Sequence, residues 1–399
     1  MRKKILLLGA GDLMYRSILK LQKENYAVFV VDKNPNSIGF KIADGYKSID
    51  IIDTISIIGY AKEIHADCII AANDAGVLTA AIASQKLDLK NVSVITAQKA
   101  TDKGLMRECW QKNNLSQPDF IICDNQEELK NKIKQFGLPS VLKPCLNWGS
   151  KGVSLIKNPK DIDFAITFAL QNNRNNRFII ERYIEGIELT IEGLVINSNT
   201  KILAFSDKEH QQHDRYKVAM SLNYPAQISD TIFLKLQKLI NQAVVALEIN
   251  NGAFHCECIL RNEDIYLVEM AARPGGGHIF TEIVEAVSGI NMPVSLAKIF
   301  LNEHITLPEN INFNGACYRF FNAPKGIFIA IENLDLAKES EGVIDIGFKM
   351  KTGTKIDAIS DDAARPGYIV TRGLDRNAAL NNAINAFHKL NFNIQKTLE

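Results

Sequence analysis

Two segments of this chain read His255-Cys256-Glu257 and Glu269-Met270-Ala271-Ala272-Arg273-Pro274-Gly275-Gly276-Gly277-His278. If the polar turn between them is centred near Glu263, an antiparallel hairpin sets Glu257 opposite Glu269, with both carboxylates on one face. Two buried carboxylates at this separation repel each other unless a positive charge lies between them. Mg²⁺ suits such oxygen ligands and usually keeps waters and phosphate oxygens in its other positions. The hairpin therefore predicts phosphate chemistry, and a hairpin with solvated acids is the alternative.

The neighbours of the two glutamates extend this hypothesis. Arg273 carries a planar guanidinium that can hold a phosphate oxygen. A helix is expected from about residue 279 to 288, and its N-terminus can receive a carboxylate or a phosphate. The residues that precede this helix are Gly275, Gly276, Gly277 and His278. His255 shares a strand face with Glu257, so it either supports the site or is a packed, hydrogen-bonded histidine.

Composition limits the class of protein. The 399 residues, 46% hydrophobic and 23% charged, predict a soluble chain of two to three domains. A net charge of +1 gives no electrostatic case for a nucleic acid or an anionic membrane as the main partner, and no apolar segment approaches the length of a membrane span. Seven cysteines, an odd number, indicate reduced thiols and a cytoplasmic location. Cys256 and Cys258, on the strand face opposite Glu257, are interpreted as core residues.

Residues 1 to about 98 alternate expected strands and helices, which is typical of a Rossmann-like parallel sheet. The expected strands are 5–8, 27–31, 68–72 and 92–95, and the first helix runs from about residue 13 to 24. Asn73 and Asp74 follow the 68–72 strand, at the carboxyl end where open α/β sheets bind ligands. A helix cap and turn is the alternative for this pair.

The first turn of this region contains Gly9-Ala10-Gly11, and Asp32 ends the second strand, as in a dinucleotide-binding fold. Met14 stands where the third glycine of that fingerprint belongs. A nucleotide-dependent dehydrogenase is therefore the weakest of the functional alternatives.

A loop rich in small residues, from Asn147 to Val153, separates two expected strands, 140–142 and 153–156. Its glycines accept the dihedral angles that bring backbone N–H groups close to phosphate oxygens. A plain hairpin turn is the alternative, and a Walker loop is excluded because Gly-Lys-Ser/Thr is absent. The polar segment from Lys208 to Arg215 is interpreted as a solvated loop, with ordering over a substrate as the alternative.

Taken in order along the chain, several motifs together resemble those of the ATP-grasp superfamily. They comprise Lys103, Lys143, the loop from Gly149 to Val153, Glu181-Arg182-Tyr183-Ile184 with Glu188, Glu257, Glu269 and Arg273. The His-x-Glu strand and the Glu-x-x-x-Arg-x-Gly-Gly run are most similar to those of carboxylate–amine ligases, including L-amino-acid ligases. The resemblance implies a mixed α/β protein with three domains: a Rossmann-like domain at 1–98, an ATP-grasp domain of two α+β subdomains at 99–311 with its lid at about 115–185, and a small C-terminal α+β domain at 312–399.

The resemblance also implies how ATP is bound. Lys103 and Lys143 would meet the α- and β-phosphates, and Glu181 would accept from the adenine amino group. The backbone at Tyr183 and Ile184 would meet the edge of the ring. Glu188 would bind the ribose hydroxyls. The mobile loop over the γ-phosphate would consist of Ser150, Lys151, Gly152 and Val153.

Glu257 and Glu269 would hold Mg²⁺, as one or two ions, while Arg273 would steady the transferred phosphoryl group, with Lys151 and Ser150 as further catalytic residues. The superfamily usually has Asn two residues after the second metal-binding glutamate, and Ala271 stands there in this chain. A second ion would then be weaker, held by water, or supported by another residue such as His255. The candidate substrate contacts are Asn73, Asp74, His255, Arg273, Gly276, Gly277 and His278.

The resemblance predicts an ATP-dependent ligase that joins a small-molecule carboxylate to an amine, with an amino acid as one substrate. The carboxylate attacks the γ-phosphate to give an acyl phosphate and ADP, and the amine then displaces phosphate. A purine-biosynthetic or bicarbonate-using member is the nearest alternative, and a non-catalytic ATP-binding module is favoured only by Ala271. A biotin-dependent carboxylase is less favoured, because Lys349-Met350-Lys351 is not the biotinyl Met-Lys-Met motif. Related ligases suggest a homodimer.

Overall fold

The N-terminal part of the chain forms a parallel sheet in the order β3-β2-β1-β4. We analysed a computed structural model, which describes all residues except 148, 150, 213–216, 324, 357–358, 360–363 and 396–399. The strands of this sheet are β1 (Lys4–Leu8), β2 (Ala27–Asp32), β3 (Gly45–Ser48) and β4 (Cys68–Ala71). The helices around them are α1 (Asp12–Lys23), α2 (Thr54–Glu63) and α3 (Asp74–Lys86).

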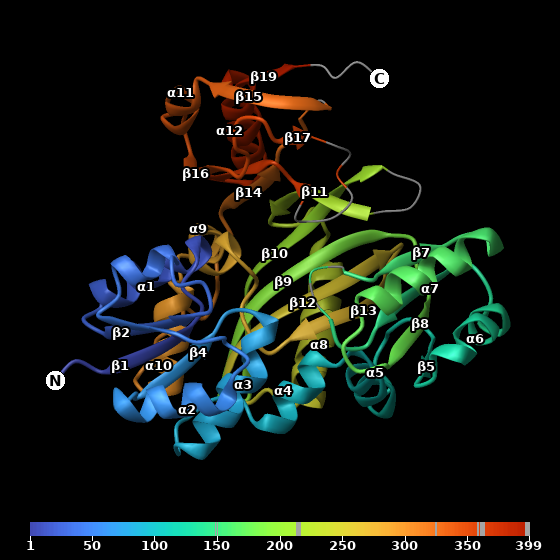
Figure 1. Ribbon diagram of the computed structural model, residues 1–399, viewed down its shortest axis with the longest axis horizontal. Helices are drawn as coiled ribbons and strands as arrows, with labels where there is room; N and C mark the ends of the chain where they lie inside the picture. The colour runs from blue at the N-terminus through green and yellow to red at the C-terminus, as the bar shows by residue number, and fades with distance from the viewer. Residues whose placement is uncertain are drawn as a thin grey trace.

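Both faces of this sheet are buried, which explains the unbroken apolar run of β1. Ile5 and Leu7 belong to a core cluster that also contains Ile18 of α1, whereas Leu6 and Leu8 pack with residues of α2 and α3. In the ribbon, these elements form the blue part at the lower left (Figure 1). The predicted Rossmann-like arrangement is confirmed.

One predicted strand is wrong. The segment 92–95 was expected to be extended, but α4 (Val94–Thr101) begins there. The Ser93 hydroxyl accepts a hydrogen bond from the backbone N–H of Thr96 and so caps the helix. A four-residue apolar run does not distinguish a strand from the first turn of a helix, and here the cap is the better signal.

A smaller antiparallel sheet follows, in the order β5-β8-β6-β7. Its strands are β5 (Phe120–Cys123), β6 (Ser140–Pro144), β7 (Ser154–Ile156) and β8 (Phe178–Arg182). The helices α5 (Lys103–Lys112), α6 (Leu129–Phe136) and α7 (Ile162–Gln171) accompany it, at the right of Figure 1. The expected hairpin around the small-residue loop is therefore present, since β6 pairs with β7.

The largest sheet has eight strands among the described residues, in the order β13-β12-β9-β10-β11-β14-β18-β16. Its first five strands are β9 (Ile187–Ile196), β10 (Asn199–Gln212), β11 (Lys217–Tyr224), β12 (Gly252–Arg261) and β13 (Asp264–Ala271). They pack on α8 (Asp230–Ala246) on one side and on the N-terminal part and α10 (Met292–Leu301) on the other. Between β13 and α10, a π-helical turn (η4, Ile279–Ile283) continues into α9 (Val284–Ser288), which ends at left-handed Gly289.

The remaining strands of this sheet lie C-terminal to the predicted boundary at residues 311/312. They are β14 (Gly315–Phe320), β16 (Val343–Phe348) and β18 (Gly367–Gly373), and β14 pairs directly with β11. The predicted boundary thus falls between strands of one sheet. A second, three-stranded sheet contains β15 (Gly326–Glu332), β17 (Lys355–Ile356) and β19 (Asn391–Gln395), with α11 (Leu334–Lys338) and α12 (Arg376–Lys389) beside it.

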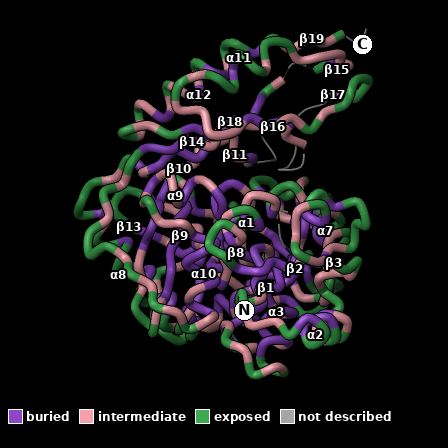
Figure 2. The backbone as a smooth tube through the Cα atoms, turned by 90° about the vertical axis from the view of Figure 1, so that its left-hand side faces the viewer, coloured by how far each residue is buried: buried purple, intermediate pink, exposed green. Residues whose placement is uncertain are grey.

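Burial is greatest where the N-terminal part meets the large sheet, while the outer turns of α2 and α11 are exposed (Figure 2). Within the described ranges, no single helix is long and apolar enough to cross a membrane. One pair, residues 279–288 and 292–301, reaches the required length and composition only when combined, and the pair is bent by 101°.

Candidate functional site

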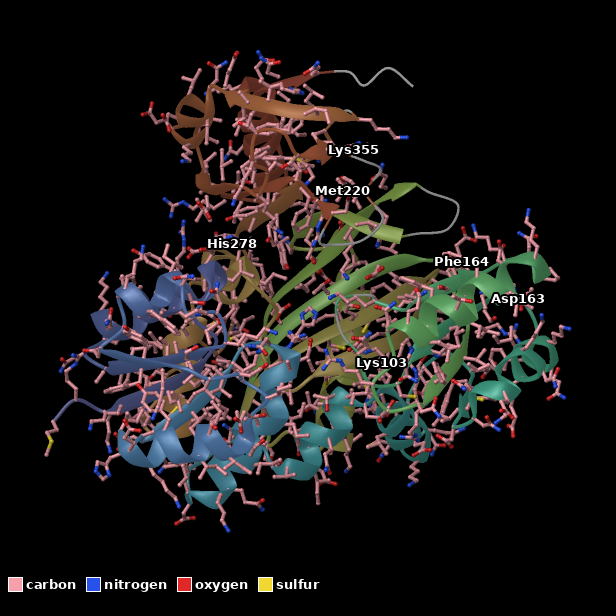
Figure 3. All side chains as sticks on the ribbon, in the orientation of Figure 1. Lys103, Asp163, Phe164, Met220, His278 and Lys355 are labelled. Carbon is pink, nitrogen blue, oxygen red and sulfur yellow. The ribbon has the colours of Figure 1, made fainter. Side chains whose placement is uncertain are left out.

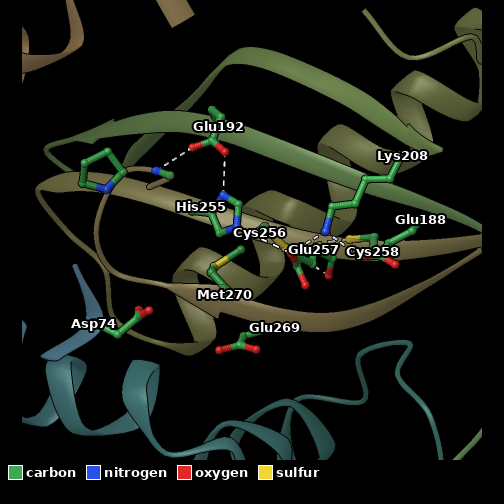
Figure 4. A network of polar contacts seen from close by, with 12 residues as sticks. Asp74, Glu188, Glu192, Lys208, His255, Cys256, Glu257, Cys258, Glu269 and Met270 are labelled. Atoms are coloured by element: carbon green, nitrogen blue, oxygen red, sulfur yellow. Dashed lines mark hydrogen bonds and ion pairs between the residues drawn. The ribbon is translucent and has the colours of Figure 1, made fainter. Parts of the chain in front are cut away.

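The two glutamates of the β12–β13 hairpin face each other as predicted. The antiparallel register pairs Glu257 with Glu269, and it shifts between Glu257 and Cys258. Cys256 and Cys258 are fully buried in the core, as expected. The register prediction is confirmed, and the two carboxylates lie near the centre of Figure 4.

Each of these carboxylates is paired with a lysine. The Lys208 ammonium lies 2.6 Å from Oε1 of Glu257, and the Lys103 ammonium lies 3.1 Å from Oε1 of Glu269. Lys103 also donates to the backbone carbonyl of Asn147, at 2.7 Å. Burial raises the pKa of Glu257, but Lys208 and His255 together outweigh it and hold the pKa well below its usual range.

Lys208 holds a second carboxylate as well. Its ammonium lies 2.5 Å from Oε1 of Glu188, whose Oε2 lies 2.9 Å from Nε2 of His210. Burial alone would raise the pKa of Glu188, yet Lys208 and His210 together lower it to about 2. The prediction of a solvated loop from Lys208 onwards is wrong for 208–212, which belong to β10, and residues 213–215 lie outside the described residues. Lys208 and His210 of this polar stretch pair with Glu188 on the neighbouring strand β9.

His255 and Glu192 form the next link. Glu192 is fully buried in β9, directly across from His255, and its Oε1 lies 2.5 Å from Nδ1 of the ring. Its other oxygen accepts from the backbone N–H of Gly275 at 2.9 Å. Burial lowers the pKa of His255, but Glu192 and Glu257 outweigh it and raise the pKa to about 9. His255 is a hydrogen-bonded histidine, and its Nε2 also lies 3.8 Å from Oε1 of Glu257, so a role in supporting the site stays a prediction (Figure 4).

Glu181 anchors two cations at the end of β8. Its Oε1 accepts from Nε of Arg107 at 2.8 Å, and its Oε2 lies 2.6 Å from the Lys143 ammonium. The carboxylate is buried, which raises its pKa, but Arg107 and Lys143 lower it to about 2. The next residue, Arg182, donates to the carbonyl of Phe136. If Glu181 also accepts a hydrogen bond from adenine, as expected, it has to use oxygens that already bind Arg107 and Lys143.

Arg273 is fixed by Asp74 of the N-terminal part. Its Nε and one terminal nitrogen each lie 2.7 Å from an oxygen of Asp74, and its other terminal nitrogen donates to the carbonyl of Pro274. This bidentate pair brings together two residues that were predicted separately as substrate contacts. Asn73 behaves as the predicted helix cap, because its side chain accepts from the N–H of Gly76.

The small-residue loop is described only in part. Gly149 and Gly152 both have positive φ angles, 68° and 75°, and Lys151 is exposed, while Val153 is half-buried. Ser150 lies outside the described residues. Tyr183 and Ile184 follow β8, and the backbone N–H of Tyr183 donates to the carbonyl of Pro139 at 3.3 Å.

The glycine run ends away from the two glutamates. A Cβ on Gly276 would have no neighbour within 4 Å, and Gly277 adopts a φ of 63° next to Leu13. His278 is only 5% exposed and packs against Tyr318 and Tyr368, which belong to β14 and β18. Figure 3 places it between the N- and C-terminal parts, apart from Lys103. His278 thus lies at a junction of the protein rather than beside Glu257.

Comparison with known proteins agrees with this geometry. Residues 136–282 match the family model of the ATP-grasp domain, and residues 319–395 match the L-amino acid ligase C-terminal domain 2. The chain contains an ATP-grasp domain.

Relatives of this ATP-grasp protein cover nearly its whole length. A formate-dependent phosphoribosylglycinamide formyltransferase of Prochlorococcus marinus is 23% identical over 399 residues, covering 98% of this chain and 97% of the relative. The structure of an L-amino acid ligase from Bacillus licheniformis superposes with a TM-score of 0.86 at 20% identity, covering 99% of both chains. The biotin carboxylase domain of Hydrogenobacter thermophilus 2-oxoglutarate carboxylase, determined with MgADP and bicarbonate, gives 0.79 at 17% identity, covering 99% of this chain and 91% of that domain. At these identities, the structural likeness shows the fold.

The donor set of this ATP-grasp protein fits a divalent cation that also binds phosphate. Two lysine ammonium groups lie against the carboxylates of Glu257 and Glu269, which shows that this place attracts positive charge. Among the residues described, no group of three or more His, Cys, Asp and Glu side chains is arranged to hold a metal ion. Two carboxylates alone leave most positions of a Mg²⁺ ion to waters and phosphate oxygens, which is its usual preference. Ala271 is buried in β13 and adds no ligand.

Sequence reasoning missed three members of the site. Glu192 is the only charged residue between positions 189 and 196 of β9, a pattern that signals a buried, paired carboxylate. Arg107 lies in α5 with no motif around it, and Lys208 was assigned to a loop. Their partners come from distant strands, so only the isolated charge of Glu192 gave a usable signal.

Proposed function

We propose that this protein is an ATP-dependent ligase that joins a small-molecule carboxylate to an amine through an acyl phosphate and releases ADP and phosphate. The observation that carries this proposal is the register of Glu257 against Glu269, with a lysine ammonium against each carboxylate. Lys103, Lys143 and Arg273 are each held by a carboxylate, those of Glu269, Glu181 and Asp74. Such preorganised charge suits the transfer of a phosphoryl group, whose catalysis is mainly positioning and electrostatic stabilisation.

In the proposed reaction, a substrate carboxylate oxygen bonds to the γ-phosphorus while the bond to the bridging oxygen of ADP breaks. The amine nitrogen then bonds to the acyl carbon, the bond to the phosphate oxygen breaks, and the nitrogen loses a proton. Lys103 and Lys143 bind the nucleotide phosphates, and Arg273, oriented by Asp74, binds the transferred group. Glu257 and Glu269 hold Mg²⁺, which would supply Lewis-acid stabilisation of the phosphate oxygens. Lys151 and Ser150 belong to the loop that would exclude water from the intermediate.

Amino acids are our first candidates for the substrates, and the match to an L-amino acid ligase domain supports them. Formate with a phosphoribosylated amine is the second candidate, because the relatives are named formate-dependent phosphoribosylglycinamide formyltransferases. A cytoplasmic location and a homodimer also belong to the proposal. Light scattering of the purified protein tests the dimer.

The test is Mg²⁺-dependent release of ADP and phosphate by the purified protein across single and paired amino acids, other carboxylates, and formate with a phosphoribosylated amine. We expect release that needs one carboxylate and one amine together. Glu269→Gln should lower it by about 100-fold or more, because the cation loses a charged ligand. Glu263→Gln, in the exposed turn of the same hairpin, is the matched control and should retain full activity. Tight ATP binding without release for any pair would favour the non-catalytic module.

A further inference from the structure

Lys208 occupies an unusual position in the network. Its side chain is 10% exposed, and its two described hydrogen bonds go to Glu188 and Glu257, at 2.5 and 2.6 Å. These carboxylates come from β9 and β12, on one side of β10 in the sheet order. Figure 4 shows the ammonium between them. One lysine therefore neutralises two partly buried acids that were assigned to different ligands, the ribose and the cation.

The same contacts exclude a cation from Glu257. A divalent ion bound to this carboxylate would lie within a few ångströms of the Lys208 ammonium, and two like charges at that distance in a buried site repel strongly. Lys103, beside Glu269, has a second anchor in the carbonyl of Asn147. Lys208 has no comparable neutral anchor among the contacts of the described chain, so its position depends on the two carboxylates.

We infer that Lys208 is an internal counterion that keeps Glu188 and Glu257 paired until nucleotide arrives, and so makes cation binding conditional on nucleotide. This inference rests on the proposed function of Glu257 as a cation ligand. Phosphate oxygens bring further ligands to the ion and negative charge to the released ammonium, so the exchange becomes favourable only with nucleotide present. Without Lys208, the same cation would be attracted by the carboxylates of Glu188, Glu257 and Glu269.

The test is a titration with Mn²⁺ alone, followed by the electron paramagnetic resonance signal of free Mn²⁺, with and without ADP. We expect the wild-type protein to bind Mn²⁺ weakly without ADP and tightly with it. Lys208→Met should bind Mn²⁺ at least about tenfold more tightly without ADP, because an uncompensated negative charge remains at the site. Adding Glu257→Gln to this variant should abolish the gain.

Lys235→Met is the matched control. Lys235 pairs with Glu263 at the exposed turn of the same hairpin, 3.0 Å apart, so its loss changes the net charge equally and should leave Mn²⁺ binding unchanged. If Lys208→Met does not fold, Lys208→Met with Glu188→Gln removes one charge of each sign and leaves Glu257 without its lysine partner. Unchanged or weaker Mn²⁺ binding in the folded variant overturns the inference.

Measuring ADP release by the wild-type protein distinguishes a failure of this inference from a failure of the proposed function. Turnover in the wild type without a gain of Mn²⁺ binding in the variant would reject the role of Lys208 and keep the ligase. A gain of Mn²⁺ binding without turnover on any substrate pair would keep the counterion and reject the ligase.

Discussion

At the scale of single residues, the site depends on a few close contacts that leave no space for an added side-chain atom. Glu192 is fully buried and accepts from both His255 and the backbone of Gly275. A Cβ on Gly275 would lie 2.6 Å from Oε1 of Glu192, closer than atoms can approach without displacement. Position 275 therefore requires glycine, because a side chain there would displace the Glu192 carboxylate that accepts from its backbone N–H. The glycine run thus has a structural role as well as the predicted role in substrate binding.

We predict that Gly275→Ala lowers the free energy of unfolding by about 2 kcal/mol, because the added methyl group forces Glu192 away from His255. Urea denaturation followed by circular dichroism measures this change. Gly276→Ala is the control, since nothing lies within 4 Å of its Cβ position. Equal stability of the two variants would contradict this account of Gly275.

At the scale of elements, Arg107 connects three of them. Its guanidinium is 1% exposed and joins α5 to Glu181 of β8 and to the carbonyls of Leu267 and Val268 in β13. The hairpin that carries Glu269 is thus tied to the small sheet that carries Lys143. These contacts fix the distance between two halves of the candidate ATP site.

Arg107→Met should lower the free energy of unfolding by about 3 kcal/mol, because it leaves two buried carbonyls unpaired and Glu181 with only Lys143. Differential scanning calorimetry checks this. Arg261→Met, at the exposed end of β12, should have little effect. A change at Arg107 no larger than that at Arg261 would mean that the buried guanidinium adds no net stability.

Strands and helices could be predicted where the pattern within one segment is distinctive. The β12–β13 register followed from alternating side chains around a short polar turn, and the first helix, expected from about residue 13 to 24, is observed as α1. It failed at 92–95, where a short apolar run begins a helix, and at 208–212, where polar residues form a strand. In β10, Lys208 and His210 both pair with Glu188 on the neighbouring strand, and a pattern within one segment cannot reveal a partner in another.

At the scale of the whole molecule, the site draws on parts far apart in sequence. Asp74 and Arg273 are separated by 199 residues, yet they form a bidentate pair. Each was a candidate on its own, from a strand end and from a motif. Their pairing required the packing of the N-terminal part against the large sheet, which no local pattern contains.

We predict that Asp74→Asn lowers kcat/KM about tenfold or more, because Arg273 loses the charge that orients it, while ADP affinity stays within about twofold. Steady-state ADP release and calorimetric titration with ADP measure the two quantities. Asp163→Asn, whose exposed carboxylate pairs with Lys130, controls for the loss of one charge. A fall in ADP affinity that accounts for the whole effect would assign Asp74 to nucleotide binding instead.

The junction at His278 predicts a dependence on pH. Burial lowers the pKa of His278 to about 4, below its ordinary value of 6.5. Between these values the unfolded chain binds a proton that the folded chain does not, so stability is full above pH 6.5 and falls as the pH drops towards 4. The loss is on the order of 2 kcal/mol.

His278→Phe keeps a ring between Tyr318 and Tyr368 but cannot take up a proton. Its free energy of unfolding should therefore fall less than that of the wild type between pH 6.5 and 4, as measured by urea denaturation at each pH. His304→Phe replaces an exposed histidine and should leave the wild-type pH profile unchanged. Identical profiles for wild type and His278→Phe would show that other groups cause the acid instability.

The eight-stranded sheet determines how this chain can be divided. A fragment ending at residue 311 would lose β14, the strand that satisfies the outer edge of β11 from Ser221 to Tyr224. That edge would then present free N–H and C=O groups, which are a template for pairing with another chain. We therefore expect a truncated protein to aggregate. In the longer chain, the C-terminal strands prevent this because β14 covers the edge of β11.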